Sequence, residues 1–345
     1  MDVFGINKRE ISIDFLRILS CFLIILRHVN DNFELINNNR ASGIILQSLS
    51  YPALPIFVML TGYLMFNKEE SYSIFFKKRF NRLLIPFVFW SFIYYSLASY
   101  IEKTNLSGIS LHQFINVLSS AGASYHLWYV YFIIAVYLFT PILRKLFTNL
   151  NNKDLIYLLL LWITINSIIP MVGIKINGNM NFIFTGWWGY IILGFFIKRL
   201  EVNKKYLTAT IIISSVIFSV CLIMTLLFEH DDYFFFNYSD AFSLPMIIVC
   251  FSSLYIFKCW NSKIGNKINT NYKIKIIALS NLTYAIYIMH AMVLGIFQKR
   301  VFGLNVDTFL SIPFIGAIFF ALIVFIFCFA AAAIIRKIPV LKRTV

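Results

Sequence analysis

The chain has 345 residues, of which 60% are hydrophobic, 18% aromatic and only 13% charged. Because an average soluble domain has about 25% charged residues, this composition excludes a disordered chain, a secreted disulfide scaffold and an ordinary cytosolic enzyme. A formal net charge of +15 would suggest a nucleic-acid partner in a soluble protein. Here the basic residues form short clusters between apolar runs, so membrane topology explains them better, and no nucleic-acid partner is expected.

Apolar runs long enough to cross a bilayer recur along the whole chain. A transmembrane helix needs about 20 apolar residues. The sequence therefore predicts an all-α integral membrane protein with about ten transmembrane helices in contact with the lipid bilayer. The expected spans are 11–29, 43–66, 83–101, 126–143, 155–172, 182–197, 206–228, 241–259, 278–298 and 312–335.

The loops between these spans alternate in positive charge. Of the 30 lysines and arginines, 23 fall in one set of loops and five in the other. The positive-inside rule then places both termini in the cytoplasm, which requires an even number of spans. The longest loops, 102–125 and 260–277, are too short to bury a core, so we expect a single transmembrane domain over 1–345 and no soluble domain.

The first expected span carries charge. Lys8 and Arg9 precede it as in a signal peptide, but no small-residue cleavage site follows, which predicts an uncleaved helix.

Arg17 and His28 are eleven residues apart, so they share one helix face at a separation of roughly 16 Å along the axis. One interpretation is that Arg17 reaches towards the inner interface, with Asp14 as a possible partner, while His28 marks the outer boundary. The other is that Arg17 and His28 form a functional pair, since ionisable residues in a span are costly.

Two further histidines lie in expected spans. His126 opens the fourth span near its outer edge, and His290 lies near the middle of the ninth. With His28 they could converge on an outward-opening cavity. Three neutral histidines could bind a metal, but no carboxylate or cysteine accompanies them at ligand spacing, so no metal is expected. The five cysteines all fall in apolar runs and are predicted to be small buried hydrophobes.

A basic segment, FFKKRFNRLLIP, covers residues 75–86 just before the third expected span. Its charges fit the positive-inside rule. Alternatively, Arg79 and Arg82, three residues apart on one helix face, could bind phosphates through their forked guanidinium groups.

Several stretches resemble the membrane-bound acyltransferase family 3, which includes bacterial O-acetyltransferases of cell-surface polysaccharides. The family's first-helix pattern, Arg followed by ten residues and His, is matched by Arg17 and His28. PIFVMLTGYLMF, residues 55–66, is similar to the second-helix segment ending in Ser-Gly-Tyr, with Thr61 in place of the serine. The later similarities are residues 75–86 with Arg79, Arg82 and Pro86 matching, HLWYV at 126–130, and LTYAIYIMH at 282–290 with Tyr284, Tyr287 and His290 matching.

The resemblance implies an acyl-CoA-dependent O-acyltransferase that moves an acyl group, with acetyl expected, from cytoplasmic acyl-CoA to an extracytoplasmic cell-surface glycan or glycolipid. The implied location is the bacterial cytoplasmic membrane. Catalysis would fall to four residues: Arg17, His28, Tyr287 and His290. His28 would be the general base, and Arg17 would hold CoA phosphates. His290 and Tyr287 would orient the acceptor or stabilise the oxyanion.

The resemblance also implies two binding sets. The cofactor-binding residues would be Arg17, Arg79 and Arg82, and the substrate-binding residues would be His126, Trp128 and Tyr284. The chemistry needs no metal. The sequence does not choose between direct transfer and an acyl-histidine intermediate, and it names neither the acceptor nor the oligomeric state.

Two other functions compete with this interpretation. An exporter of a polysaccharide or lipid-linked saccharide would also carry charges in its spans, but the sequence shows no internal repeat and no paired Gly/Pro-broken helices. A scaffold in a polysaccharide-synthesis complex would explain neither Arg17 nor His28. The absence of a phosphate-binding glycine loop and of a Gly-x-Ser-x-Gly elbow disfavours an ATP-driven pump and a serine hydrolase.

Overall fold

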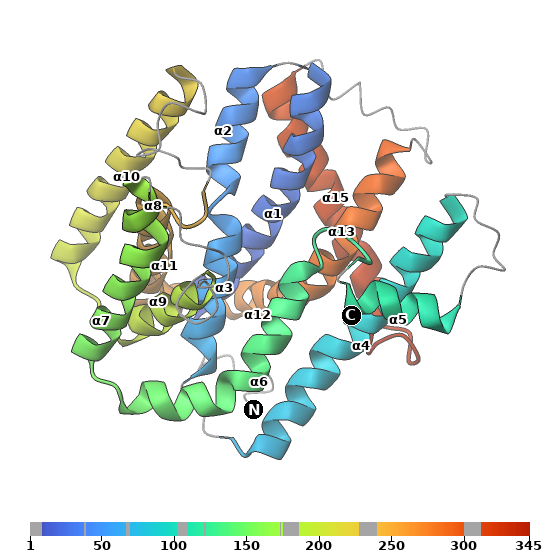
Figure 1. The fold of residues 1–345 in the computed structure, drawn as a ribbon, viewed down its shortest axis with the longest axis horizontal. Coiled ribbons are helices and arrows are strands. Elements are labelled where there is room, and N and C mark those ends of the chain that lie inside the picture. Colours follow the sequence, from blue (N-terminus) through green and yellow to red (C-terminus); the bar gives the residue numbers. More distant parts are fainter. Residues whose placement is uncertain are drawn as a thin grey trace. The chain divides into compact units, whose positions relative to one another are not determined.

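A computed structural model describes residues 9–37, 39–66, 70–101, 110–120, 122–172, 174, 186–227, 240–299 and 312–345. Every regular element in these ranges is a helix (Figure 1). In chain order the α-helices are α1 (Ile11–Asn37), α2 (Arg40–Ser50), α3 (Ala53–Met65), α4 (Tyr72–Ile101), α5 (Leu111–Ser119), α6 (Trp128–Asn149), α7 (Asn152–Ile163), α8 (Ile169–Met171), α9 (Trp188–Arg199), α10 (Lys204–Leu227), α11 (Leu244–Ile264), α12 (Thr270–Ser280), α13 (Thr283–Gln298) and α15 (Pro313–Ile335). A π-helical turn, Thr164–Ile168, joins α7 to α8, and a 3-10 turn, Gly265–Lys267, follows α11.

The prediction of an all-α membrane protein is confirmed, and a helix occupies the described part of each of the ten expected spans. By length and hydropathy, six described helical stretches could cross a membrane, or seven if α12 and α13 form one span. These stretches are Arg40–Met65, Trp128–Asn149, Asn152–Met171, Lys204–Leu227, Leu244–Lys263 and Pro313–Ile335. The start of the expected span 182–197 lies outside the described residues. The cytoplasmic placement of both termini stays a prediction.

The chain divides into two compact units, each made of separate stretches of sequence. Unit 1 comprises Met1–Asn67, Leu146–Asn281 and Phe309–Ala321, and unit 2 comprises Lys68–Lys145, Leu282–Thr308 and Leu322–Val345. The expected organisation as one domain over 1–345 stays a prediction.

Unit 1 is built around a close contact between α3 and α9. A Cβ added to Gly62 would lie 2.0 Å from the carbonyl oxygen of Ile191, and one added to Gly194 would lie 1.9 Å from that of Met59. The two helix backbones therefore touch at both glycines, where any side chain would push them apart, as is common where membrane helices pack through small residues. This contact fixes which neighbouring side chains of α3 and α9 face each other.

Local sequence sets where the helices of unit 1 begin. Pro52 separates α2 from α3, because proline has no N–H for the ladder. Asn151 begins α7 with a capping box, in which its side chain accepts from the Asp154 N–H and the Asp154 side chain accepts from the Asn151 N–H.

The five cysteines are buried and unpaired with one another, as the sequence predicts.

Candidate active site

The beginning of α1 in unit 1 holds a buried carboxylate. Asp14 is 5% exposed, on the first turn of the helix. Its Oδ1 accepts a hydrogen bond of 2.6 Å from the hydroxyl of Ser280, the last residue of α12. An ionised group this deeply buried needs hydrogen bonds and opposite charge to remain stable.

Two arginines provide that opposite charge. The Nη1 atom of Arg17 lies 3.6 Å from Asp14 Oδ1 and donates a 3.2 Å hydrogen bond to Ser280 Oγ. The Nε atom of Arg9 lies 3.6 Å from Asp14 Oδ2, and its Nη2 donates to the side-chain carbonyl of Asn281 at 3.1 Å. These residues therefore combine two guanidinium groups with one carboxylate. The pairing of Asp14 with Arg17, which the sequence offers as one alternative, is present, and Arg17 keeps a quarter of its side chain exposed, at 24%.

The other end of α1 carries His28 and Arg27. Arg27 forms an ion pair of 2.9 Å with Asp31 and lies over the ring of Tyr51, with 4.5 Å between its Cζ and the ring centroid. His28 Nδ1 is 3.8 Å from the second carboxylate oxygen of Asp31, beyond hydrogen-bond range. Arg27 thus has two structural contacts, while His28 presents its Nδ1 edge to a carboxylate.

Unit 2 brings His126 and His290 together. Their ring centroids are 4.7 Å apart, and both side chains are buried. His290 Nδ1 lies 2.5 Å from the carbonyl oxygen of Tyr287, and His126 Nε2 lies 3.2 Å from that of Ile288. Because a carbonyl only accepts, these contacts place a proton on each of the two nitrogens. In its neutral form His290 then carries its lone pair on Nε2, and His126 carries its own on Nδ1, 3.0 Å from the Ser124 hydroxyl.

The backbone of α13 around His290 is bound by a tyrosine of α4. The Tyr94 hydroxyl donates to the Ile288 carbonyl at 2.8 Å and accepts from the Met292 N–H at 3.0 Å. A side chain inserted between a carbonyl and the N–H four residues later is a known cause of local helix bending. Tyr94 also stacks edge-on against His126, with 5.5 Å between ring centroids. The tyrosine therefore holds both the histidine pair and the helix turn that carries His290.

The other candidate site residues of unit 2 lie at different places within that unit. Tyr287 donates from its hydroxyl to the His126 carbonyl at 2.5 Å and is 3% exposed, so it belongs to the histidine cluster. Tyr284 donates to the Leu83 carbonyl at 3.0 Å, which ties α13 to α4. Trp128 is exposed at the start of α6, with its ring edge-on to Tyr129. His112 is exposed on α5, and His230 lies outside the described residues.

The basic segment of α4 surrounds one carboxylate and one aromatic ring. Glu70 accepts a 3.0 Å hydrogen bond from Lys78 and lies 3.7 Å from Arg79. The hydrogen bond from Lys78 is the main reason that the pKa of Glu70 lies below its usual range, and Arg79 and Arg144 add to the effect. The guanidinium groups of Arg79 and Arg144 lie 5.6 and 5.4 Å from the centroid of the Phe75 ring. Arg82, by contrast, is exposed.

Sequence reasoning missed several of these contacts. In the sequence, Arg9 and Arg144 are two of the basic residues that the positive-inside rule counts, yet Arg144 is only 9% exposed. Ser280 and Asn281 precede the LTYAIYIMH stretch and carry no charge, and Tyr94 is one aromatic residue among many. Only the packing of the helices brings Arg9, Ser280 and Asn281 together at Asp14, Tyr94 to the turn that carries His290, and Arg144 to Phe75.

The fold and these clusters define a multi-pass membrane protein with a charged cluster around Asp14 in unit 1 and a buried histidine pair in unit 2. A family model described as an acyltransferase domain, of the acyltransferase 3 type, matches residues 10–335. The chain belongs to this family, and it is therefore a membrane O-acyltransferase. No curated protein matches the chain, and no solved structure matches it.

Family membership decides between the competing functions. It favours the enzyme over the exporter and over the scaffold, and it implies an acyl donor. Arg17 and His28 lie within the matched range.

Proposed function

We propose that the protein transfers an acyl group, with acetyl as the expected group, from cytoplasmic acyl-CoA to a hydroxyl of an extracytoplasmic cell-surface glycan or glycolipid. The proposed location is the bacterial cytoplasmic membrane, with both termini in the cytoplasm and one transmembrane domain over 1–345. The observation that carries the proposal is the cluster at the start of α1, where Arg9 and Arg17 flank a single buried carboxylate, Asp14.

The surplus positive charge of this cluster suits the phosphates of CoA. Asp14 and Ser280 contact the Arg17 guanidinium, and 24% of the side chain is exposed, where an anionic ligand can reach it. Arginine binds phosphate through two parallel hydrogen bonds, which is why we assign it the anionic end of the donor. Arg79 and Arg82 are proposed as further donor contacts, with Arg79 the stronger because Glu70 and Phe75 hold it in place.

His28 is proposed as the general base. The acceptor O–H transfers its proton to the neutral imidazole while its oxygen attacks the thioester carbonyl, and the C–S bond then breaks to release the CoA thiolate. A neutral histidine suits this step near pH 7. If Nδ1 keeps its proton on the side of Asp31, the lone pair lies on Nε2, the nitrogen that must accept the acceptor's proton. An acyl-histidine intermediate would use the same nitrogen.

His290 and Tyr287 are proposed to orient the acceptor or to stabilise the oxyanion. His290 is held on Nδ1 by the Tyr287 carbonyl, so its Nε2 has a defined chemical state. Preorganised groups of this kind stabilise developing charge because they do not reorient during the reaction. His126, Trp128 and Tyr284 are proposed as acceptor contacts, and no metal is part of the proposed chemistry.

The test is transfer of label from [14C]acetyl-CoA to the cell envelope. Membranes containing the protein are compared with membranes lacking it and with membranes containing the His28→Ala variant at matched levels. Label in the glycan fraction that depends on the intact protein supports the proposal. Label that appears equally in all three preparations would contradict it.

A further inference from the structure

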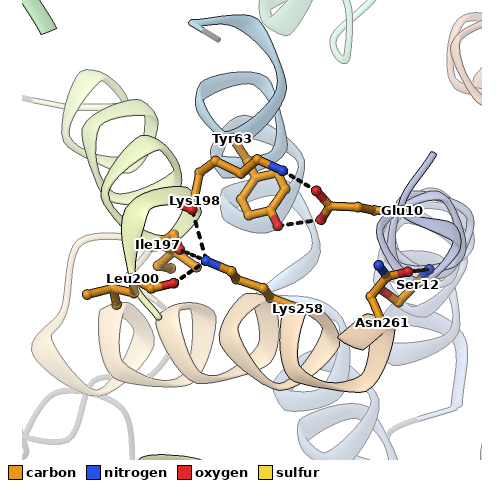
Figure 2. Close-up of polar contacts among 8 residues, drawn as sticks. All are labelled: Glu10, Ser12, Tyr63, Ile197, Lys198, Leu200, Lys258 and Asn261. Carbon is orange, nitrogen blue, oxygen red and sulfur yellow. Dashed lines mark hydrogen bonds and ion pairs between the residues drawn. The ribbon is translucent and has the colours of Figure 1, made fainter. Parts of the chain in front are cut away.

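A second polar cluster of unit 1 lies immediately before α1 and is separate from the one at Asp14. Glu10 binds two residues through its carboxylate: Oε2 accepts a 2.5 Å hydrogen bond from the Tyr63 hydroxyl, and Oε1 accepts from the Lys198 ammonium (Figure 2). Tyr63 belongs to α3 and is fully buried, while Lys198 lies in the last turn of α9. One carboxylate thus connects the entry of α1 to two other helices.

The end of α9 is fixed in turn by α11. The Lys258 ammonium donates to the carbonyl oxygens of Ile197 and Lys198, both at 2.9 Å, and to that of Leu200 (Figure 2). These carbonyls have no further helix turn to bind them, and a lysine at a helix C-terminus satisfies such groups and complements the helix dipole. Lys258 therefore fixes the turn that presents Lys198.

The glycine contact between α3 and α9 explains why Tyr63 and Lys198 meet. Tyr63 follows Gly62, and Lys198 is one helical turn after Gly194, so the close approach of the two backbones brings both side chains to one place. The Lys198 ammonium lies 4.5 Å from the centroid of the Tyr63 ring, a cation–π distance, in addition to its bond to Glu10. The cluster is thus a consequence of the core packing of unit 1.

Glu10 immediately precedes the first residue of α1 and binds its first turn through the backbone. Its backbone carbonyl accepts from the N–H groups of Ile13 and Asp14, at 3.0 and 3.2 Å. The Ser12 N–H, one of the groups that an α-helix leaves unbound at its N-terminus, lies 3.4 Å from the Asn261 side-chain oxygen of α11. Arg17 follows Glu10 by seven residues, about two helical turns, on the same helix face. A shift or rotation of the α1 terminus would therefore move Arg17 with it.

We propose that Glu10, Tyr63 and Lys198 form an anchor that fixes the position and rotation of the α1 terminus and so positions Arg17 for the acyl donor. The three are positioning residues, since they act through α1 rather than on the donor. The inference rests on the proposed role of Arg17 in binding donor phosphates.

The first test separates positioning from loss of fold. The variants Glu10→Gln and Tyr63→Phe keep size and shape, and Glu201→Gln and Tyr206→Phe, which change exposed residues of the same unit, serve as matched controls. KM and kcat are measured with acetyl-CoA and with S-acetyl-pantetheine, a donor without phosphates. We expect the anchor variants to raise KM for acetyl-CoA about tenfold, as for loss of one hydrogen bond to a charged group, with KM for S-acetyl-pantetheine unchanged. An equal loss with both donors would overturn the proposal, because a merely structural role acts on both.

The second test is a double-mutant cycle with Arg17→Ala. If the anchor acts through Arg17, then adding Glu10→Gln to Arg17→Ala causes no further loss of transfer, whereas fully additive losses would refute the anchor. The cycle is independent of the donor's identity. If Arg17→Ala itself lowers transfer from both donors equally, the phosphate-binding role in the proposed function fails, while the cycle still decides whether Glu10 acts through Arg17.

Discussion

In unit 1, the buried Asp14 is contacted by two guanidinium groups and a hydroxyl, whereas in unit 2 the buried His126 and His290 are contacted by aromatic rings and backbone carbonyls. The first cluster carries net charge and keeps Arg17 and Arg9 partly exposed. The second is neutral when its histidines are neutral, and it is closed, with His290 fully buried.

This difference indicates that the two clusters have different functions. Charged pairs with exposed guanidinium groups can accept an anion at little cost, because the ligand adds to an electrostatic arrangement that already exists. Neutral rings held by carbonyls have defined tautomers, which suits proton transfer and orientation rather than binding of phosphate. Variants of the Asp14 cluster should therefore act mainly on donor affinity, and variants of the histidine pair in unit 2 mainly on the rate of transfer.

The largest effect expected in unit 2 is that of His290→Ala. Removing a group that orients the acceptor or stabilises developing charge should lower kcat by about a hundredfold or more while KM for acetyl-CoA changes little. Steady-state transfer kinetics at matched membrane levels measure both constants. His112→Ala, which removes an exposed histidine of the same unit, is the control and should be near normal. A rise in donor KM with kcat preserved would remove the distinction between the Asp14 cluster and the histidine pair.

The next largest effect should come from Arg17→Ala. We expect KM for acetyl-CoA to rise by about tenfold to a hundredfold, since a charge-assisted contact to phosphate contributes about 1.5–3 kcal/mol. Arg17→Lys should recover only part of the affinity, because lysine lacks the forked geometry. Arg9→Ala should act in the same direction but less strongly. Binding of radiolabelled CoA to purified protein provides the measurement, and unchanged affinity in Arg17→Ala would count against the assignment.

A smaller effect is expected in the basic segment of α4. Replacing Arg79 and Arg82 together by alanine should weaken CoA binding and leave membrane insertion intact, with lysine at both positions recovering part of it. Of the single variants, Arg79→Ala should account for most of the loss, because Glu70 and Phe75 hold Arg79 in place while Arg82 is exposed. The same binding assay compares them. Equal CoA affinity in the double alanine variant and the parent protein would leave membrane topology as the only explanation for both arginines.

The smallest effect concerns pH. The pKa of Glu70 is lowered mainly by the hydrogen bond from Lys78, so Glu70 stabilises the folded state above its ordinary pKa of 4.5, and this contribution is lost as the pH falls through the lowered value. Lys78 is 65% exposed, so we expect less than about 1 kcal/mol. Thermal unfolding in detergent should give Glu70→Gln a slightly lower Tm than the parent at pH 7. The difference should shrink as the pH falls below 4.5, and a difference that grows there would contradict the sign.

Sequence predicted the helices well because apolar runs of membrane length are a strong signal. A helix occupies the described part of each of the ten expected spans, while the functional role predicted for Arg17 and His28 from their spacing and the family resemblance stays a prediction. The partners of these residues were harder to find. Ser280 and Tyr94 reach Asp14 and α13 through hydroxyl groups from distant helices, and a single serine or tyrosine in an apolar run has no distinguishing pattern.

The anchor at Glu10 shows the same limit. Glu10, Tyr63 and Lys198 are far apart in sequence, and the contact that unites them depends on backbone approach at Gly62 and Gly194. A glycine in an apolar run can mark a close contact, a kink or nothing at all. Lys198 is also one of the basic residues that the positive-inside rule counts. Because membrane topology already explains its charge, the sequence gives no reason to expect its bond to a carboxylate.

The central claim, that α1 carries the catalytic base, is tested most directly by comparing transfer of labelled acetyl groups by His28→Ala and Arg27→Ala at matched membrane levels. The two residues are neighbours, but Arg27 is turned about 100° away from His28 and is bound to Asp31 and Tyr51. We predict that His28→Ala lowers transfer by about a hundredfold to ten-thousandfold, as for loss of a general base, while Arg27→Ala stays near the parent rate. Near-normal transfer by His28→Ala would show that α1 is not the catalytic helix.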